Sequence, residues 1–190
     1  MSVSLMDLWL AILLAGLFCW IASAVIHMVI KYHNADMKNL SNEDEVASAI
    51  GAGKPAPGLY HMPWCGDMKN MGKPEVQEKF NKGPVAVVTV FQNGLPPMGK
   101  LLVQQFLYFV FASLLVAYAA SLAYPVGTDY MTIFRQVFVL AFLAHGVGTI
   151  PYSIWYGHPW SNCVRFLIDA IIYAAVTAGT FAWLWPSMTN

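Results

Sequence analysis

Charged residues are scarce in this sequence. Basic and acidic residues number ten each in 190 residues, so the formal net charge is zero and no basic field exists that would attract nucleic acid. Only three cysteines occur, Cys19, Cys65 and Cys163, and no CxxC or CxxCH pattern joins them. These absences exclude nucleic-acid partners, a disulfide framework and covalent haem attachment.

Signatures of soluble enzymes are also missing. The sequence has no phosphate-binding loop, HExxH, GxSxG or paired-carboxylate pattern. We therefore expect no catalytic residues and no enzymatic activity, and no motif predicts a cofactor.

Apolar residues dominate what is present, since they make up 58% of the chain. A helix needs about 20 of them to cross a bilayer. Four runs reach or approach this length, at residues 6–30, 101–123, 131–156 and 162–185. We predict an all-α integral membrane protein in which residues 1–190 form a single membrane domain with four transmembrane helices.

The segment 31–100 differs from the rest of the chain. It holds all eight lysines and seven of the ten acidic residues, and it is rich in glycine and proline. We expect one large extramembrane segment between the first two spans, with short helices at 42–50 and 74–80. The β-prone run 84–91 has no evident partner strand, so contact with the membrane surface is the preferred interpretation.

The third run is the most interrupted of the four. Gly146 and Pro151 predict a kink near Thr149. A turn precedes the fourth run, and Ser161 or Asn162 is expected to be its N-cap.

Basic residues predict the orientation, because they favour the cytoplasmic side. Lys31 and Lys100 flank the segment 31–100, and Arg165 begins the fourth span on the same side, whereas the opposite side has only Arg135. This places the segment in the cytoplasm and both termini outside.

Polar side chains within the spans gather toward one end, and ionisable groups there are costly unless they are paired or functional. Arg165 and Asp169 are spaced i, i+4 and are expected to neutralise each other. The alternative is a proton, ion or ligand pathway that includes His145, which otherwise serves as a hydrogen-bond partner between helices. The candidate intramembrane cluster is His27, Gln104, Gln105, His145, Arg165 and Asp169.

Two metal-binding hypotheses remain open. His27 and His145 are conceivable as the two axial ligands of a haem. The second hypothesis is a metal site that includes a histidine and a cysteine with the spacing H-x₃-C. The competing interpretation is that these loop residues do not cluster. The candidate ligands are His61 and Cys65, with His33, His158 or Cys163 to complete the site.

Several stretches resemble a known family. They are NEDEVASAI, GPVAVVTV, PPMGKLL, SIWYGHPWS and DAIIYAAVTAGTFAWLWP, which together extend over nearly the whole chain. In these the sequence resembles an uncharacterised family of small bacterial inner-membrane proteins with four spans. The resemblance implies a multi-pass protein of the bacterial inner membrane, and it implies no activity, cofactor or site residue.

Three functions follow as hypotheses. The first is a non-enzymatic accessory or assembly subunit of a larger membrane complex, or a homo-oligomer, in contact with the lipid bilayer and a protein partner. Small residues that suit helix contact support it: Ala112, Ser113, Ala119, Ala120, Ser121, Ala174, Ala175, Ala178 and Gly179. The second is transport or sensing of protons, ions or small solutes through the intramembrane cluster, and the third is haem or transition-metal binding.

Overall fold

Four long apolar helices form most of the chain. A computed structural model gives the structure and describes residues 1–187. The helices long and apolar enough to cross a membrane are Trp9–Ile30, Met98–Ala123, Tyr130–Trp155 and Trp160–Leu184. They confirm the predicted all-α membrane fold, with ends that differ from the predicted ones by up to three residues. Their regular parts are α1 (Trp9–Ala24), α4 (Met98–Ala123), α5 (Tyr130–His145), α6 (Ile150–Trp155) and α7 (Trp160–Leu184).

The third span is broken where glycine and proline predicted a kink. Helix α5 ends at His145, a 3₁₀ turn covers Val147–Thr149, and α6 begins at Ile150. Helix α7 begins at Trp160 with Pro159 as its N-cap, so the predicted capping by Ser161 or Asn162 is wrong. The Asn162 side chain instead contacts a distant turn, as described below.

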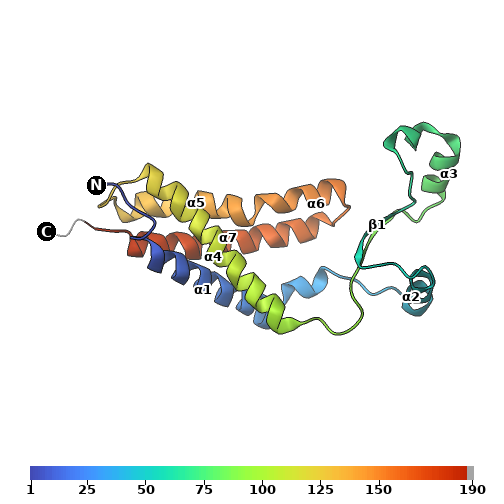
Figure 1. Cartoon of the computed structure of the whole chain (residues 1–190), viewed down its shortest axis with the longest axis horizontal. Coiled ribbons are helices and arrows are strands. Elements are labelled where there is room, and N and C mark those ends of the chain that lie inside the picture. Colours follow the sequence, from blue (N-terminus) through green and yellow to red (C-terminus); the bar gives the residue numbers. More distant parts are fainter. Residues whose placement is uncertain (188–190) are drawn as a thin grey trace. The chain divides into compact units, whose positions relative to one another are not determined.

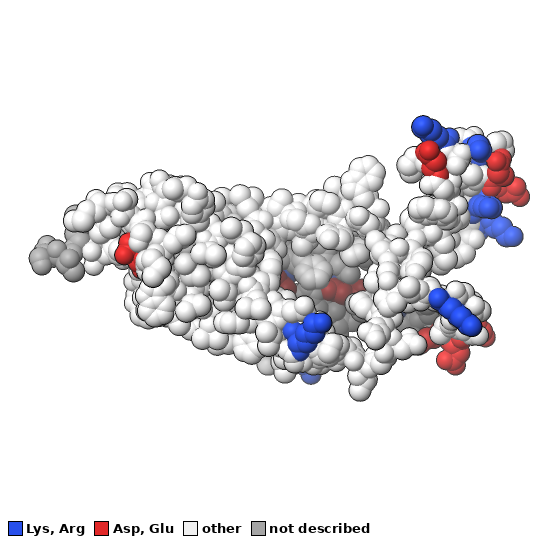
Figure 2. All heavy atoms as spheres, in the orientation of Figure 1, with Lys and Arg blue, Asp and Glu red and all other residues white. Residues whose placement is uncertain are grey.

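The chain divides into two compact units, Met1–Met37 with Pro97–Asn190, and Lys38–Pro96. The second unit contains most of the charged side chains, and the helices are almost free of them on the face that Figure 2 shows. Its elements are α2 (Glu43–Ala52), β1 (Gly58–Met62), the 3₁₀ turn η3 (Met68–Gly72), α3 (Pro74–Lys82) and β2 (Ala86–Val90).

The β-prone run has a partner strand. Strand β2 pairs antiparallel with β1, from Gly58 opposite Val90 to Met62 opposite Ala86. The preferred interpretation, contact of this run with the membrane surface, assumed that the run has no partner strand. That assumption is wrong. The partner lies more than twenty residues earlier and has no alternating pattern, so local periodicity did not identify it.

Small residues allow the helices of the first unit to pack closely. Helix α5 packs along α7, and α1 packs against α4 and α7 (Figure 1). Ala15, Ala117, Ala141 and Ala174 are fully buried in the core between them. In a bilayer, packing of this kind replaces the hydrophobic effect as the main attraction between helices.

Backbone contacts hold one end of the four helices together. The Val126 amide donates to the Met1 carbonyl (3.0 Å) and the Gly127 amide donates to the Pro186 carbonyl (2.9 Å). The indole of Trp185 donates to the Pro125 carbonyl at 3.1 Å. The end of α1 and the start of α4 and α7 therefore lie at the opposite end, where the polar residues gather.

Gly16 marks the closest approach of α1 to α4, and this gives a first prediction. A Cβ atom at Gly16 would lie 2.7 Å from Val110 Cγ2 and 3.0 Å from the Val110 backbone. Gly16→Ala should lower the free energy of unfolding by about 1–3 kcal/mol, because overpacking outweighs alanine's helix propensity. Gly99→Ala is the control, since its Cβ meets nothing within 4 Å. Denaturation of both variants in mixed micelles tests this, and equal stabilities would contradict it.

Candidate metal centre

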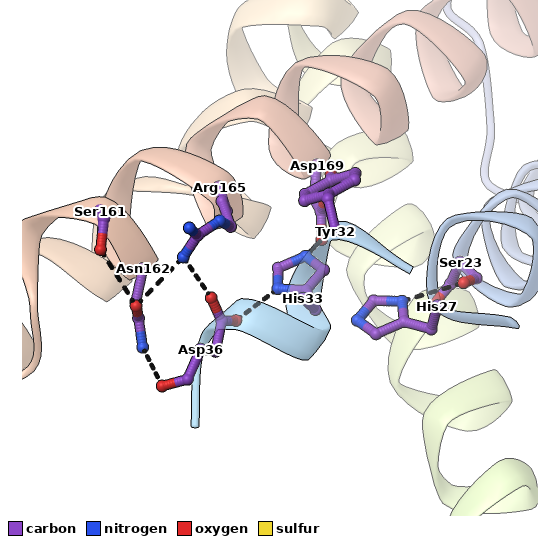
Figure 3. Close-up of polar contacts among 9 residues, drawn as sticks. All are labelled: Ser23, His27, Tyr32, His33, Asp36, Ser161, Asn162, Arg165 and Asp169. Carbon is purple, nitrogen blue, oxygen red and sulfur yellow. Dashed lines mark hydrogen bonds and ion pairs between the residues drawn. The ribbon is translucent and has the colours of Figure 1, made fainter. Parts of the chain in front are cut away.

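A tight turn after α1 builds the site. The last residues of the first span form a π-helical turn, η1 (Val25–Ile30), which carries His27. Lys31 then adopts a left-handed conformation with φ of 59° and reverses the chain into the 3₁₀ turn η2 (Tyr32–Ala35). This reversal brings His33 and Asp36 against α7, which carries Arg165 and Asp169 (Figure 3).

His33 lies between two carboxylates. Its Nδ1 donates to Asp36 Oδ2 at 2.6 Å, and its Nε2 lies 2.9 Å from Asp169 Oδ2 (Figure 3). The other oxygen of Asp169 accepts a hydrogen bond from the Tyr32 hydroxyl. Asp169 is only 3% exposed, so these contacts replace the water that a carboxylate would otherwise bind.

Arg165 pairs with Asp36, and the predicted Arg165–Asp169 pair is wrong. The Arg165 Nη1 donates to Asp36 Oδ1 at 2.6 Å, and Asp169 pairs with His33. Asn162 supports the arrangement, because its amide donates to the Asp36 carbonyl at 3.1 Å and its oxygen accepts from Arg165 at 3.3 Å. The i, i+4 spacing permits a local pair, but the turn after α1 supplies a partner for each residue.

The network favours the ionised form of Asp36. Burial alone would raise the pKa of Asp36, but hydrogen bonds from His33 and Arg165 and the charges of both groups bring that pKa below its ordinary value. One arginine stands against two carboxyl groups, so with both of them ionised and His33 neutral the group carries one negative charge. A proton on His33 or a bound metal ion would compensate it.

His27 completes a set of potential ligands. Its Nδ1 lies 2.9 Å from the Ser23 carbonyl, which can only accept, so Nδ1 carries a proton, and in the neutral ring Nε2 has a free lone pair. The His27 ring stacks on that of His33, with centroids 4.6 Å apart and planes 2° from parallel. One donor atom each of His27, His33 and Asp169 lie within 4.8 Å of one another.

These three side chains fit a metal ion in their chemistry. Both imidazoles direct Nδ1 to a carbonyl or carboxylate acceptor, the arrangement that orients histidine ligands and leaves Nε2 for the metal. Ligand atoms about 2.1 Å from one ion lie about 3.4 Å apart in tetrahedral geometry. Separations of up to 4.8 Å must therefore shorten by as much as about 1.4 Å, whereas His33 Nε2 and Asp169 Oδ2, 2.9 Å apart, must move apart slightly. Because the two rings are parallel, binding one ion also requires the exposed His27 ring to turn.

Other predicted site residues occupy different places. Gln104 is exposed, whereas Gln105 and His145 line a cavity beside the site. The His145 Nδ1 lies 3.2 Å from the Tyr108 hydroxyl, and its ring packs against Tyr108, Phe109 and Tyr173. His145 on α5 therefore contacts side chains of α4 and α7.

The second predicted metal set is divided between the two units. His61 and Cys65 belong to the unit Lys38–Pro96, where His61 Nδ1 donates to the Pro63 carbonyl at 3.0 Å. Cys163 is buried, with its sulfur 3.8 Å from the Thr149 hydroxyl, and His158 packs on Tyr152. Within residues 1–187 only His27, His33 and Asp169 form a group of potential ligands.

Sequence reasoning missed the roles of Tyr32, His33 and Asp36. A local signal was present, since His33 and Asp36 are spaced i, i+3 immediately after a span. Their partners lie more than 120 residues away along the chain, and no local pattern specifies that contact. Two carboxylates and one arginine at matching ends of neighbouring spans were the available hint.

The Arg165–Asp36 pair gives a second prediction. Arg165→Gln should lower the free energy of unfolding by about 1–3 kcal/mol, because Asp36, 12% exposed, loses a charged donor. Asp36→Asn should have a similar effect, and the double variant should be less destabilised than the sum of the two. Strict additivity in this double-mutant cycle would contradict the pairing.

Comparison with protein-family models, with curated proteins and with solved structures finds no match for this chain. The resemblance to small bacterial inner-membrane proteins therefore stays a prediction.

Proposed function

We propose that this multi-pass membrane protein binds one divalent transition-metal ion through His27, His33 and Asp169. The observation that carries the proposal is the grouping of their three donor atoms within 4.8 Å. Two of these donors belong to imidazoles whose Nδ1 atoms already have acceptors, Ser23 and Asp36. The negative charge left by Asp36, Asp169 and Arg165 adds an electrostatic attraction for a cation.

The ligand set favours zinc or ferrous iron. Two imidazole nitrogens and one carboxylate oxygen suit these ions, and such sites keep positions open for water or another ligand. Mg²⁺ and Ca²⁺ are less suited, since they prefer oxygen ligands. A metal ion is also favoured over haem, because His27 stacks on His33 while His145 contacts Tyr108.

A network without metal is the competing account. A protonated His33 would donate to both Asp36 and Asp169 and would neutralise the group. In that account His27 contributes only its stacking on His33 and its bond to Ser23. The two accounts therefore differ most at His27, which is essential to the first and dispensable in the second.

Cobalt substitution tests the proposal. The protein, purified in detergent and treated with chelator, is titrated with Co²⁺, whose visible absorption reports the number and geometry of its ligands. We expect bands that saturate at one Co²⁺ per chain and disappear when Zn²⁺ is added. Absorption no different from Co²⁺ in detergent buffer would overturn the proposal.

An accessory role in a larger complex is compatible with metal binding. The small residues that supported this role in the sequence are less available for a partner, because Ala112, Ala120, Ala174 and Ala178 are buried in contacts within the chain. Purification of the tagged protein from native membranes tests it, since an accessory subunit would bring a partner in stoichiometric amount. Placement in a bacterial inner membrane with the metal centre facing the cytoplasm also stays part of the proposal, on the asymmetry of lysine and arginine.

A further inference from the structure

A cavity of about 440 Å³ lies beside the metal ligands, a size within the range of small-molecule sites. Side chains from the first, second and fourth spans, together with His145, form its wall. His27 and Asp169 belong to both the cavity wall and the proposed metal site. A molecule in the cavity would therefore contact the metal centre.

Aromatic rings and neutral hydrogen-bonding groups dominate the wall. The rings are those of Trp20, Tyr108, Phe109, His145, Phe166 and Tyr173. Tyr108, His145 and Gln105 carry groups that can donate to a ligand oxygen. No lysine or arginine lines the cavity in the described part of the chain, and Asp169 adds a negative charge.

Apolar, exposed side chains line the rest of the cavity. Met28, Met98, Leu101 and Leu102 lie on helices that are apolar enough to cross a membrane, and each is more than 40% exposed. Such surfaces face lipid in a membrane protein. A ligand can therefore enter from the bilayer and leave an apolar tail among these side chains.

We propose that this cavity binds the head of a lipid-soluble quinone, a flat neutral ring with carbonyl acceptors and an apolar tail. The rings of the wall offer stacking surfaces to the head. The Tyr108 hydroxyl and His145 Nδ1 lie 3.2 Å apart and are hydrogen bonded to each other. When His145 Nδ1 donates to the Tyr108 oxygen, the Tyr108 hydroxyl proton is left to donate to a carbonyl of the ligand. The proposal goes beyond the metal site, and binding of the quinone does not require the ion.

Other amphiphiles fit the wall less well. A phospholipid head carries a phosphate, which proteins bind with arginine or lysine, and here it would meet the Asp169 carboxylate instead. A plain alkyl chain would place apolar atoms against the Gln105 amide and would leave the donors of the wall without a ligand acceptor. A neutral head group with hydrogen-bond acceptors brings no phosphate near Asp169 and accepts from the donors of the wall.

Tryptophan fluorescence tests the proposal in the full-length protein in detergent. Decylubiquinone is added with chelator or with Zn²⁺ present, and Trp20 in the cavity wall acts as the reporter. We expect saturable quenching under both conditions, which Trp20→Phe largely removes. Tyr108→Phe should weaken binding by about tenfold, through loss of one hydrogen bond.

A pair of matched variants locates the ligand. Ala24 lines the cavity, whereas the neighbouring Val25 is 44% exposed and does not line it. Ala24→Phe should abolish quenching and Val25→Phe should retain it, with folding of each checked by circular dichroism. Equal binding by the two variants would overturn the proposal, and so would unchanged binding by Tyr108→Phe if Ala24→Phe fails to fold.

Competitors test the head group. Monoolein and short-chain phosphatidylglycerol are added at the concentrations that decylubiquinone requires, and we expect neither to displace it. Displacement by either at equal concentration would overturn the assignment to a quinone. Quinone binding without Co²⁺ or Zn²⁺ binding would support the quinone site and overturn the proposed metal site. Binding of Co²⁺ or Zn²⁺ without quinone binding would support the metal site and overturn the quinone site.

Discussion

His27→Ala should weaken Zn²⁺ binding by more than about 100-fold, while the protein remains nearly as stable as the unmodified chain. Loss of a residue that only orients a ligand costs 10- to 100-fold in metal affinity, and His27 is proposed as a ligand itself. Its other contacts are weak, since the side chain is exposed and bonds only to the Ser23 carbonyl among the described residues. Such a loss should change the free energy of unfolding by less than about 1 kcal/mol.

Competition with a fluorescent zinc indicator measures this affinity, and denaturation in mixed micelles measures the stability. His158→Ala is the matched control, because His158 belongs to the same unit and is not part of a group of three potential ligands among the described residues. Equal zinc affinity in the His27 and His158 variants would favour the network without metal. A large loss of stability in the His27 variant alone would show that its role is structural.

Asp169→Asn should reduce both metal binding and stability. Asparagine has nearly the same shape but no charge, so the ion loses its only anionic ligand and we expect affinity to fall by more than about 100-fold. His33 also loses its charged partner in a buried position, which should lower the free energy of unfolding by about 1–3 kcal/mol. The same competition and denaturation measurements check both effects.

Asp36→Asn is the comparison for this variant. Asp36 contacts His33 Nδ1 rather than the proposed ion, so it should weaken zinc binding by only about 10- to 100-fold. Both variants remove one carboxylate from the network and lower its negative charge equally. If the two variants lose zinc affinity to the same extent, charge alone attracts the ion and Asp169 is not a ligand.

The sequence predicted the parts of the fold that local patterns determine. Length and hydropathy located the four spans, and glycine and proline located the break between His145 and Ile150. The pairing of β1 with β2 was missed, because its register depends on residues far apart in the chain. The predicted N-cap of α7 was wrong, because Pro159 is the N-cap and the Asn162 side chain donates to the Asp36 carbonyl instead.

The site could be predicted only in part for the same reason. His27, Arg165 and Asp169 were identified by the cost of placing polar groups in a span. Their partners were not, because the reversal at Lys31 that brings His33 and Asp36 to α7 leaves no periodic signal. A spacing of four residues favoured the Arg165–Asp169 pair, but two separate long-range contacts satisfy these residues.

The metal content of the purified full-length protein tests the central claim most directly. The chain is expressed in medium with zinc and iron, purified without chelator, and analysed by elemental mass spectrometry beside the His27→Ala variant. We expect close to one zinc or iron ion per chain in the unmodified protein and much less than one in the variant. Absence of a stoichiometric transition metal from the unmodified protein, or equal amounts in both, would contradict the claim.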